Sequence, residues 1–434
     1  MRLERPVAGA VAAAPAPGPS RGVRIVLDAR PLQDPDRSPT TAAYLEGLLG
    51  AFDAAPLDGE SFTFLLQADL ADPTERFRRL DVRGRRLLPP TRLLGAAALT
   101  LDPFLVRGAS IGTAWRAERR GAGGAVYHTA GGAVPVPVLS DVATVVTLLD
   151  LAPWELPEIF QRGTAARFGQ RLRAGLIRQA AAVIVATEEV ARDARRLLHL
   201  RRSRIRVVAL APRAAFRPEA ATAGRDAERT RLGLPGRYLV YAGRFDARHD
   251  LGTLLSSLAI LAAAGRPASL APDLPWPPRV LLVGASPDDR ASLARAAARE
   301  GVRETLTYAP HLPPERLAGL VAGARAALLP VVSEAAGLSA LEALAAGTPV
   351  VASAVGALPG VVGTAGILVE PGEPERLARA LTTIWSDDRV HERLRLEAQE
   401  RALRDRRTWD DVAADTRATY ADVGQRGSRH RHRP

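Results

Sequence analysis

Short apolar runs alternate with longer amphipathic stretches along most of the chain. Eleven runs of four to nine residues are rich in valine, leucine and isoleucine, and helical stretches separate many of them. This alternation is typical of parallel α/β sheets. We expect strands at 23–28, 62–66, 125–128, 142–150, 181–187 and 205–210 in the first half, and at 237–243, 279–284, 304–309, 326–332 and 348–353 in the second.

The helical stretches and one connector divide these strands into two sets. An arginine-rich amphipathic helix is expected around Gln161 to Gln179, and Thr187 is placed to cap the next helix. A segment rich in proline and charge, 211–236, separates the halves. The pattern therefore predicts an α/β fold with two doubly wound Rossmann-like domains facing a central cleft, at residues 22–212 and 213–408. Ligands of such sheets bind at the carboxyl ends of the strands.

The amino-acid composition excludes several kinds of catalytic group and a membrane-spanning helix. The chain has 434 residues, 47% of them hydrophobic, which is enough to bury two ordinary cores. It contains no cysteine, lysine or asparagine, which excludes thiol nucleophiles, a Walker A lysine and a Schiff-base lysine. No apolar run reaches the ~18 residues of a membrane-spanning helix. Residues 1–21 have the composition of a disordered leader rather than a signal peptide, and 424–434 that of a disordered basic tail. We expect a cytoplasmic protein.

Net charge is +12 and is carried wholly by arginine, with dense runs at 76–86 and 201–206. Aromatic residues make up only 5% of the chain, and no aromatic interleaving accompanies the arginines, so nucleic acid is not an expected partner. Phosphate-bearing substrates or an anionic membrane surface fit better, the latter implying peripheral contact at the inner membrane face. Ordinary solvated faces of a basic protein remain the alternative for any single run.

The segment from Ser333 to Ser353, SEAAGLSALEALAAGTPVVAS, carries the strongest functional signal. A buried strand leads into a turn with a glycine and then into a helix, and the free N–H groups of such a helix N-terminus bind phosphate. Glu334 and Glu342 stand eight positions apart there, and carboxylates accept hydrogen bonds from sugar hydroxyls. A sugar joined to a nucleoside diphosphate satisfies both features. For Glu342 an alternative stays open, that Ser339 and Glu342 form only a capping box.

A second site is predicted in YAGRFDARHD, from Tyr241 to Asp250, again a strand end followed by a glycine. Arg244 follows Gly243, and a guanidinium is the side chain best suited to a phosphate. The alternative is a surface loop of mixed charge.

These two segments resemble the signatures of GT-B glycosyltransferases, in particular the large retaining family 4 (glycosyl transferases group 1). The resemblance runs from VRIVLDARPL near the start to GILVEPGEPERLARAL near the end. It implies transfer of a sugar from a nucleotide-diphosphate sugar to a glycan or lipid-linked acceptor in assembly of cell-envelope polysaccharide, with retention and without metal or cofactor. It further implies that the helix at 409–423 packs back on the first domain.

The resemblance also assigns roles to residues. Glu334 and Arg244 would act in catalysis, the first on the sugar hydroxyls. Glu342 would bind the ribose. His249 stands where the family has a lysine, and a histidine is only partly charged at neutral pH. The expected sugar-donor site comprises Gly243, Arg244, His249, Gly337, Leu338 and Glu342, and the acceptor side comprises Tyr44, His128 and Asp150.

Several positions depart from the family pattern. Thr40, Ala42 and Ala43 stand where two glycines and an arginine are expected, and Leu149 replaces a histidine that contacts the transferred sugar. Ala335, Ala336 and Gly360 are further departures. These losses support an alternative hypothesis, a catalytically impaired GT-B pseudoenzyme that acts as a binding partner. A nicotinamide dehydrogenase is disfavoured because GAGG, at 121–124, precedes a strand instead of following one.

Overall fold

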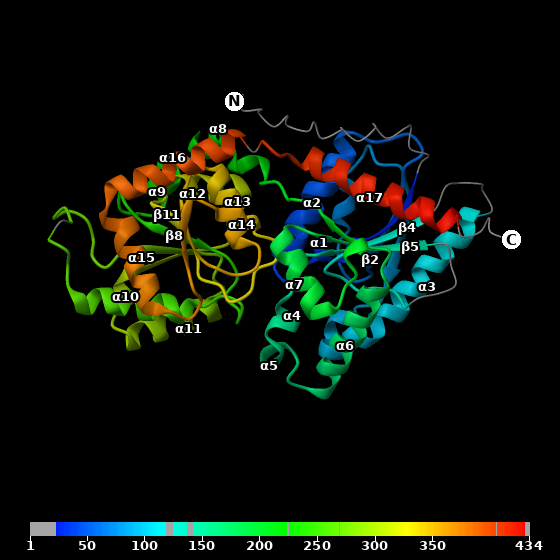
Figure 1. The fold of residues 1–434 in the computed structure, drawn as a ribbon, viewed down its shortest axis with the longest axis horizontal. Coiled ribbons are helices and arrows are strands. Elements are labelled where there is room, and N and C mark those ends of the chain that lie inside the picture. Colours follow the sequence, from blue (N-terminus) through cyan, green and yellow to red (C-terminus); the bar gives the residue numbers. More distant parts are fainter. Residues whose placement is uncertain are drawn as a thin grey trace, which may run out of the picture.

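The computed structural model describes residues 23–118, 125–136, 142–223, 225–268, 270–404 and 406–429. Two α/β domains lie side by side, each built on one parallel sheet (Figure 1). The expectation of two doubly wound domains is therefore confirmed. The leader at 1–21 and the GAGG segment at 121–124 lie outside the described residues.

The first domain contains a seven-stranded sheet of order β3-β2-β1-β4-β5-β6-β7, in which every pair is parallel. Arg24 of β1 lies opposite Ser61 of β2 and Ala125 of β4. The order reverses between β1 and β4, which places a topological switch point there. The strands are β1 (Arg24–Asp28), β2 (Ser61–Gln67), β3 (Val82–Leu88), β4 (Ala125–Ala130), β5 (Val142–Leu148), β6 (Ala182–Val185) and β7 (Ile205–Val207).

Helices cover both faces of this sheet. Successive β1 side chains alternate between two hydrophobic clusters, Ile25 and Leu27 facing the cluster that contains α2, and Val26 facing the cluster that contains α3. The helices are α1 (Arg30–Gln33), α2 (Pro39–Ala54), α3 (Ala98–Glu118), α4 (Ala152–Glu155), α5 (Pro157–Phe160), α6 (Thr164–Gln179) and α7 (Glu188–Leu198), with short 3₁₀ turns η1 (Pro73–Arg76), η2 (Thr91–Ala97) and η3 (Arg202–Arg204). Thr187 caps α7, as the sequence predicts, by accepting from the Val190 N–H at 3.3 Å.

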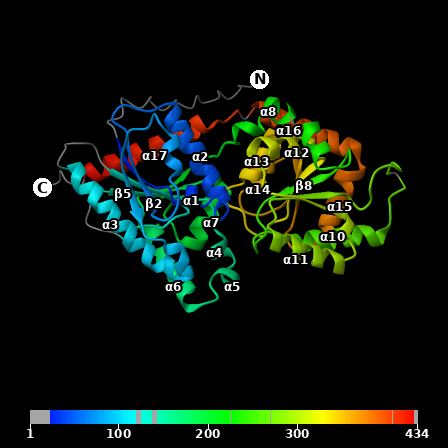
Figure 2. The same ribbon diagram turned by 180° about the vertical axis from the view of Figure 1, so that it is seen from behind.

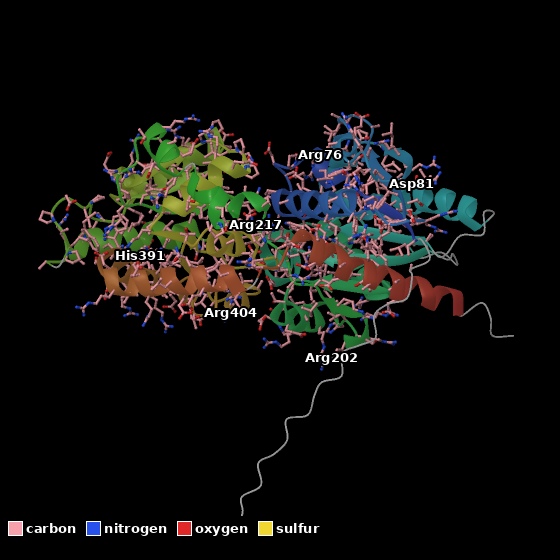
Figure 3. All side chains as sticks on the ribbon, turned by 90° about the horizontal axis from the view of Figure 1, so that it is seen from above. Arg76, Asp81, Arg202, Arg217, His391 and Arg404 are labelled. Atoms are coloured by element: carbon pink, nitrogen blue, oxygen red, sulfur yellow. The ribbon has the colours of Figure 1, made fainter. Side chains whose placement is uncertain are left out.

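The second domain repeats the plan with a six-stranded parallel sheet of order β10-β9-β8-β11-β12-β13. Its strands are β8 (Leu239–Ala242), β9 (Val280–Val283), β10 (Leu306–Ala309), β11 (Ala326–Leu329), β12 (Val350–Ser353) and β13 (Gly366–Val369). Its helices are α8 (Pro218–Ala223), α9 (Arg225–Arg231), α10 (Leu251–Ala264), α11 (Pro287–Arg299), α12 (Pro314–Gly323), α13 (Leu338–Ala345), α14 (Leu358–Val362), α15 (Pro374–Ser386) and α16 (Asp388–Arg404), with 3₁₀ turns η4 (Ala214–Phe216) and η5 (Arg303–Thr305). Arg217 marks the connector between the two domains (Figure 3).

The last helix, α17 (Trp409–Arg429), lies on the first domain although the second precedes it in the chain (Figures 1 and 2). The Trp409 ring meets the Tyr44 ring edge-on at 5.9 Å between centroids, and Arg417 binds Glu60 at 2.7 Å. A Cβ on Gly47 would come within 2.2 Å of the Trp409 ring, so this glycine lets α17 approach α2 closely. The helix continues to Arg429, into the segment at 424–434 that the sequence predicts as a tail, and residues 430–434 lie outside the described part of the chain.

All eleven predicted strands are present, each shorter than or within two residues of its expected bounds. Two strands were not predicted. β3 carries three arginines at the sheet edge and resembles a charge run, while β13 has only four residues. Neither forms the long apolar run by which a buried strand is recognised.

Candidate functional site

A cavity of about 700 Å³ lies between the two domains, at the carboxyl ends of strands from both sheets. Its size is that of a site for a small organic ligand. The first domain lines it with Asp36, Thr40, Ala43, Leu149 and Asp150, and the second with residues after β8, β9, β10 and β11, among them Gly243, Arg244, Asp246, Arg248, His249, Ser286, His311, Glu334, Leu338, Ser339 and Glu342.

The turn after β8 gathers three basic side chains around one carboxylate. Asp246 binds Nε of Arg244 at 2.8 Å and Nδ1 of His249 at 3.1 Å, and it also pairs with Arg248. Burial alone would raise the pKa of the Asp246 carboxyl, but hydrogen bonds from His249 and Arg248 and the charge of Arg248 outweigh burial and hold this pKa far below its usual range. Asp246 is therefore a permanent anion, and it lies where a phosphate would meet these cations.

Two of these arginines also reach the first domain. Nη1 of Arg248 lies 2.6 Å from Oδ2 of Asp150, and Nη1 of Arg244 donates to the carbonyl of Arg37. A third contact joins Ser333, whose hydroxyl donates to the carboxylate of Glu155; burial raises the pKa of this carboxyl. These contacts span the cavity and hold the two domains together.

The turn before α13 is shaped by Glu334 itself. Its Oε1 accepts from the N–H groups of Ala336 and Gly337, both at 2.9 Å. Gly337 has a φ of 68°, and a Cβ there would lie 2.9 Å from Cγ2 of Val361, so the position requires glycine. The N–H of Gly337 is thus already used, contrary to the expectation that it faces a phosphate.

The N–H groups of Leu338 and Ser339 begin α13 and border the cavity. As the first amides of a helix they have no partner within it, and no described group accepts from them. The capping-box alternative for Ser339 and Glu342 is wrong, because no side chain caps this helix and Glu342 bonds elsewhere. This helix N-terminus can accept a ligand anion.

Glu342 is held by an arginine, Arg213, that no sequence motif indicates. Nε and Nη2 of Arg213 lie 2.5 and 2.9 Å from the two carboxylate oxygens, and the guanidinium also lies over the Phe216 ring. Burial lowers the pKa of Arg213, but the hydrogen bond and charge of Glu342 outweigh it and raise this pKa overall. Glu342 is only 5% exposed, so this pair fixes its orientation at the cavity wall.

The structure contradicts two of the three acceptor-side assignments. Tyr44 and His128 are fully buried beneath α17 and do not line the cavity. Nε2 of His128 lies 2.8 Å from Oγ1 of Thr147, and its Nδ1 lies 2.6 Å from the Tyr420 hydroxyl. His128 sits inside β4 with its side chain on the α17 face of the sheet, so it cannot reach the strand ends. Asp150 does line the cavity.

Leu149 and Thr40 also line the cavity, so the departures from the family pattern face the ligand space. Among the described residues, no group of three or more metal-ligating side chains is placed to hold a metal ion. No helix in that part of the chain is both long and apolar enough to span a bilayer.

Residues 236–387 match the family model described as glycosyl transferases group 1. Among curated proteins, the chain is 37% identical to a D-inositol 3-phosphate glycosyltransferase of Streptomyces griseus over 47% of this chain and 43% of the relative. It is 32% identical to the protein of that name from Jonesia denitrificans, over 56% and 58% of the two chains. The chain thus spans about half the length of the curated relatives that it matches.

Solved structures extend the likeness to both domains. Sucrose-phosphate synthase from Thermosynechococcus elongatus aligns with a TM-score of 0.68 at 20% identity, over 93% of this chain and 99% of that chain. Anabaena HepE in complex with UDP aligns with a TM-score of 0.64 at 18% identity, over 92% and 100%. WaaG, a glycosyltransferase of lipopolysaccharide biosynthesis, aligns with a TM-score of 0.62 at 17% identity, over 92% and 99%.

The family match covers the domain that supplies the arginines, the turn of Glu334 and the α13 N-terminus, and the structural alignments cover both domains and the cleft. The chain thus has the GT-B fold, and residues 236–387 of its second domain match the model of the glycosyl transferases group 1.

Proposed function

We propose that the protein transfers a sugar from a nucleoside-diphosphate sugar to an acceptor, with retention at the anomeric carbon and without a bound metal. One observation carries the proposal. Basic side chains, the free N–H groups of α13 and two carboxylates border a single cavity between the domains. Cations and amides suit a diphosphate, and carboxylates suit sugar hydroxyls.

The sugar donor would lie along the second domain. Arg244 and His249, with the amides of Leu338 and Ser339, would hold the diphosphate. Glu334 would accept from hydroxyls of the sugar through Oε2, since Oε1 is occupied by its own turn. Glu342, oriented by Arg213, would accept from the ribose. As the bond to the sugar breaks, negative charge grows on the leaving diphosphate, and each preorganised group that stabilises it contributes about 3 kcal/mol.

The acceptor would enter from the first domain, beside Asp150 and Leu149. The curated relatives are named for D-inositol 3-phosphate, and one structural neighbour is a sucrose-phosphate synthase. Phosphorylated polyols and sugars therefore belong in the first acceptor screen, beside glycan and lipid-linked acceptors of cell-envelope polysaccharide assembly. UDP and UDP-glucose, which are bound in structures of HepE, lead the screen of nucleotides.

Calorimetry with UDP, GDP and ADP tests the diphosphate site. Arg244→Ala should weaken binding of the preferred nucleotide at least tenfold, as loss of one charge-assisted contact predicts. Arg299→Ala, an exposed arginine at the end of α11, is the matched control and should bind as the wild type does. Equal affinity of the wild type and Arg244→Ala would remove the proposed site. Turnover that survives EDTA, with product anomers assigned by NMR, tests metal independence and retention.

The second candidate is a GT-B pseudoenzyme that binds without turnover. Two features favour it. Leu149 is an apolar side chain where the family has a histidine. Arg248 is paired with Asp246 and Asp150, so its charge is already neutralised by the protein. A panel of nucleotide sugars separates the candidates. Tight nucleotide binding without hydrolysis or transfer of any sugar supports the pseudoenzyme, and turnover of one donor excludes it.

A further inference from the structure

Large exposed hydrophobic side chains concentrate on one part of the first domain. Ten large hydrophobic side chains are exposed in the described part of the chain, and five of them lie on η2, α3 and α6. We call them the apolar patch: Leu93 (73% exposed), Leu94 (49%), Leu101 (46%), Phe104 (53%) and Phe168 (59%). Exposed apolar groups scattered singly need no explanation, but a cluster on packed neighbouring elements indicates an interaction surface.

The three elements are packed together. η2 continues directly into α3, and a Cβ on Gly169 of α6 would come within 2.6 Å of Leu99 Cβ in α3. Figures 1 and 2 both show α3 and α6 side by side. Val106 of α3 packs in the cluster with Val26, on the sheet face opposite α2 and α17. The patch therefore lies on the outer side of the first domain, where no other described element covers it.

Arginines outnumber acidic residues in the segments around the patch, although two of them, Arg83 and Arg85, pair with Asp81 and Asp72. Residues 82–109 contain five arginines and one acidic residue, Asp102, which is mostly buried and paired with Arg30 at 3.1 Å. Helix α6 contains four arginines and no acidic residue. Two of them, Arg167 and Arg171, are exposed and make no ion pair with any described residue. Apolar side chains beside the two unpaired arginines of α6 complement a surface that is anionic outside and apolar beneath.

The same helix links the patch to elements that lie behind the acceptor wall of the cleft. Phe168 and Arg173 lie on α6, five positions apart. Nη2 of Arg173 donates to the carbonyl of Gly131 at 3.2 Å, and its guanidinium lies over the Trp154 ring. The negative charge of Asp150, which borders the cavity, acts on Arg173. A surface bound at the patch would thus lie beside the acceptor side of the cleft.

We propose that η2, α3 and α6 form a docking surface for an anionic lipid bilayer, and that docking presents the cleft to an acceptor anchored in that bilayer. The apolar patch would insert among the lipid headgroups, while Arg167 and Arg171 would contact their phosphates. Neither attraction alone gives stable attachment, and the two together give reversible peripheral binding. Only the statement about the acceptor rests on the proposed glycosyltransferase function.

Vesicle co-sedimentation of the full chain tests docking. The wild type should bind vesicles of phosphatidylcholine and phosphatidylglycerol in equal parts, and not vesicles of phosphatidylcholine alone. Arg167→Gln/Arg171→Gln should bind about thirtyfold more weakly, since each arginine near an anionic surface contributes about a fivefold gain in affinity. Leu93→Ser/Phe104→Ser/Phe168→Ser should lose binding altogether.

The matched control is Leu396→Ser/Leu403→Ser, which removes two exposed leucines of α16 on the second domain. It should bind vesicles as the wild type does. Equal loss in this control would show that general hydrophobicity is responsible, and would overturn the proposal. A wild-type protein that does not bind anionic vesicles would also overturn the proposal. So would a wild-type dimer that the triple variant converts to a monomer, because the patch would then be an interface between two copies.

Nucleotide calorimetry on the same variants separates this proposal from the proposed function. The patch residues lie outside the cavity, so the triple variant should keep the wild-type affinity for nucleotide. Vesicle binding by a protein that binds no nucleotide supports docking and counts against the proposed function. Nucleotide binding without vesicle binding supports the proposed function and counts against docking.

Discussion

Arg248 and Asp150 join the two domains across the cleft, with Nη1 of the arginine 2.6 Å from Oδ2 of the aspartate. The same guanidinium binds Asp246 in its own turn, so the orientation of one side chain is set by both walls of the cavity. Arg248 is 17% exposed and Asp150 37%, so the pair is screened in part by solvent and contributes about 1 kcal/mol to closure.

Replacing Asp150 should loosen the closed arrangement. Asp150→Asn removes the charge but keeps the shape, and a loss of about 1 kcal/mol shifts the balance between closed and open forms about fivefold. Small-angle X-ray scattering without nucleotide should then show a larger radius of gyration. Asp226→Asn, at an exposed position on α9, is the control. Identical scattering of Asp150→Asn and wild type would show that the other contacts across the cleft suffice.

Removing the charge of Asp246 should strengthen nucleotide binding. The carboxylate neutralises part of the positive charge of Arg244, Arg248 and His249, and a diphosphate must compete with it. We expect Asp246→Asn to bind the preferred nucleoside diphosphate about tenfold more tightly at low salt, with the gain shrinking as salt rises. Calorimetry at two salt concentrations measures this. Weaker binding would mean that Asp246 serves mainly to position the arginines.

The contributions of Arg213 and Glu342 to the free energy of unfolding should be coupled. Arg213→Met leaves a carboxylate that is 5% exposed without its partner, and we expect the free energy of unfolding in urea to fall by about 2 kcal/mol. Adding Glu342→Met should restore part of that loss, because the unpaired charge is removed. Strictly additive losses in this double-mutant cycle would contradict the coupling.

Burial of His128 should make the protein sensitive to acid. Burial lowers the pKa of His128 to about 3 in the folded protein, from about 6.5 in the unfolded chain. Between these values the unfolded chain binds a proton that the folded protein does not, so stability is full above about pH 6.5 and falls as the pH drops towards 3.

His128→Gln should therefore flatten the dependence of the free energy of unfolding on pH between about 6.5 and 5. Part of the slope should remain, because burial also lowers the pKa of His391 to about 4. His199→Asn, at an exposed position, should keep the wild-type slope. A slope unchanged in His128→Gln would mean that the histidine does not stay neutral in the folded protein.

The sequence predicted the parts of the fold that depend on local pattern. Buried strands such as β5 and β12 are apolar runs, and the helices between them show their own caps and periodicity. β3 escaped prediction because it carries three arginines on an edge strand, two of them exposed, a pattern that resembles a disordered charge run until its neighbour β2 is known. The pairing of two strands cannot be predicted from the sequence of either strand alone.

The arrangement of groups around the cavity was predicted where one short segment supplies several of them, as around Arg244 and Glu334, and their roles stay a prediction. It was missed where partners are distant in the chain. Arg213 lies 129 positions before Glu342, and nothing in its own segment indicates a partner. His128 was misassigned because its position within β4, facing α17, depends on a helix almost three hundred residues later.

The return of α17 to the first domain has a consequence for biosynthesis. Phe52 and Tyr44 of α2 are fully buried, and the rings of Tyr420 and Trp409 pack against them from a helix that follows the second domain in the chain. As the ribosome extends the chain, the amino-terminal half emerges first yet keeps an uncovered aromatic face until translation has passed Tyr420. The first domain must therefore complete its core after the second domain has been made, the reverse of the usual order from amino to carboxyl terminus.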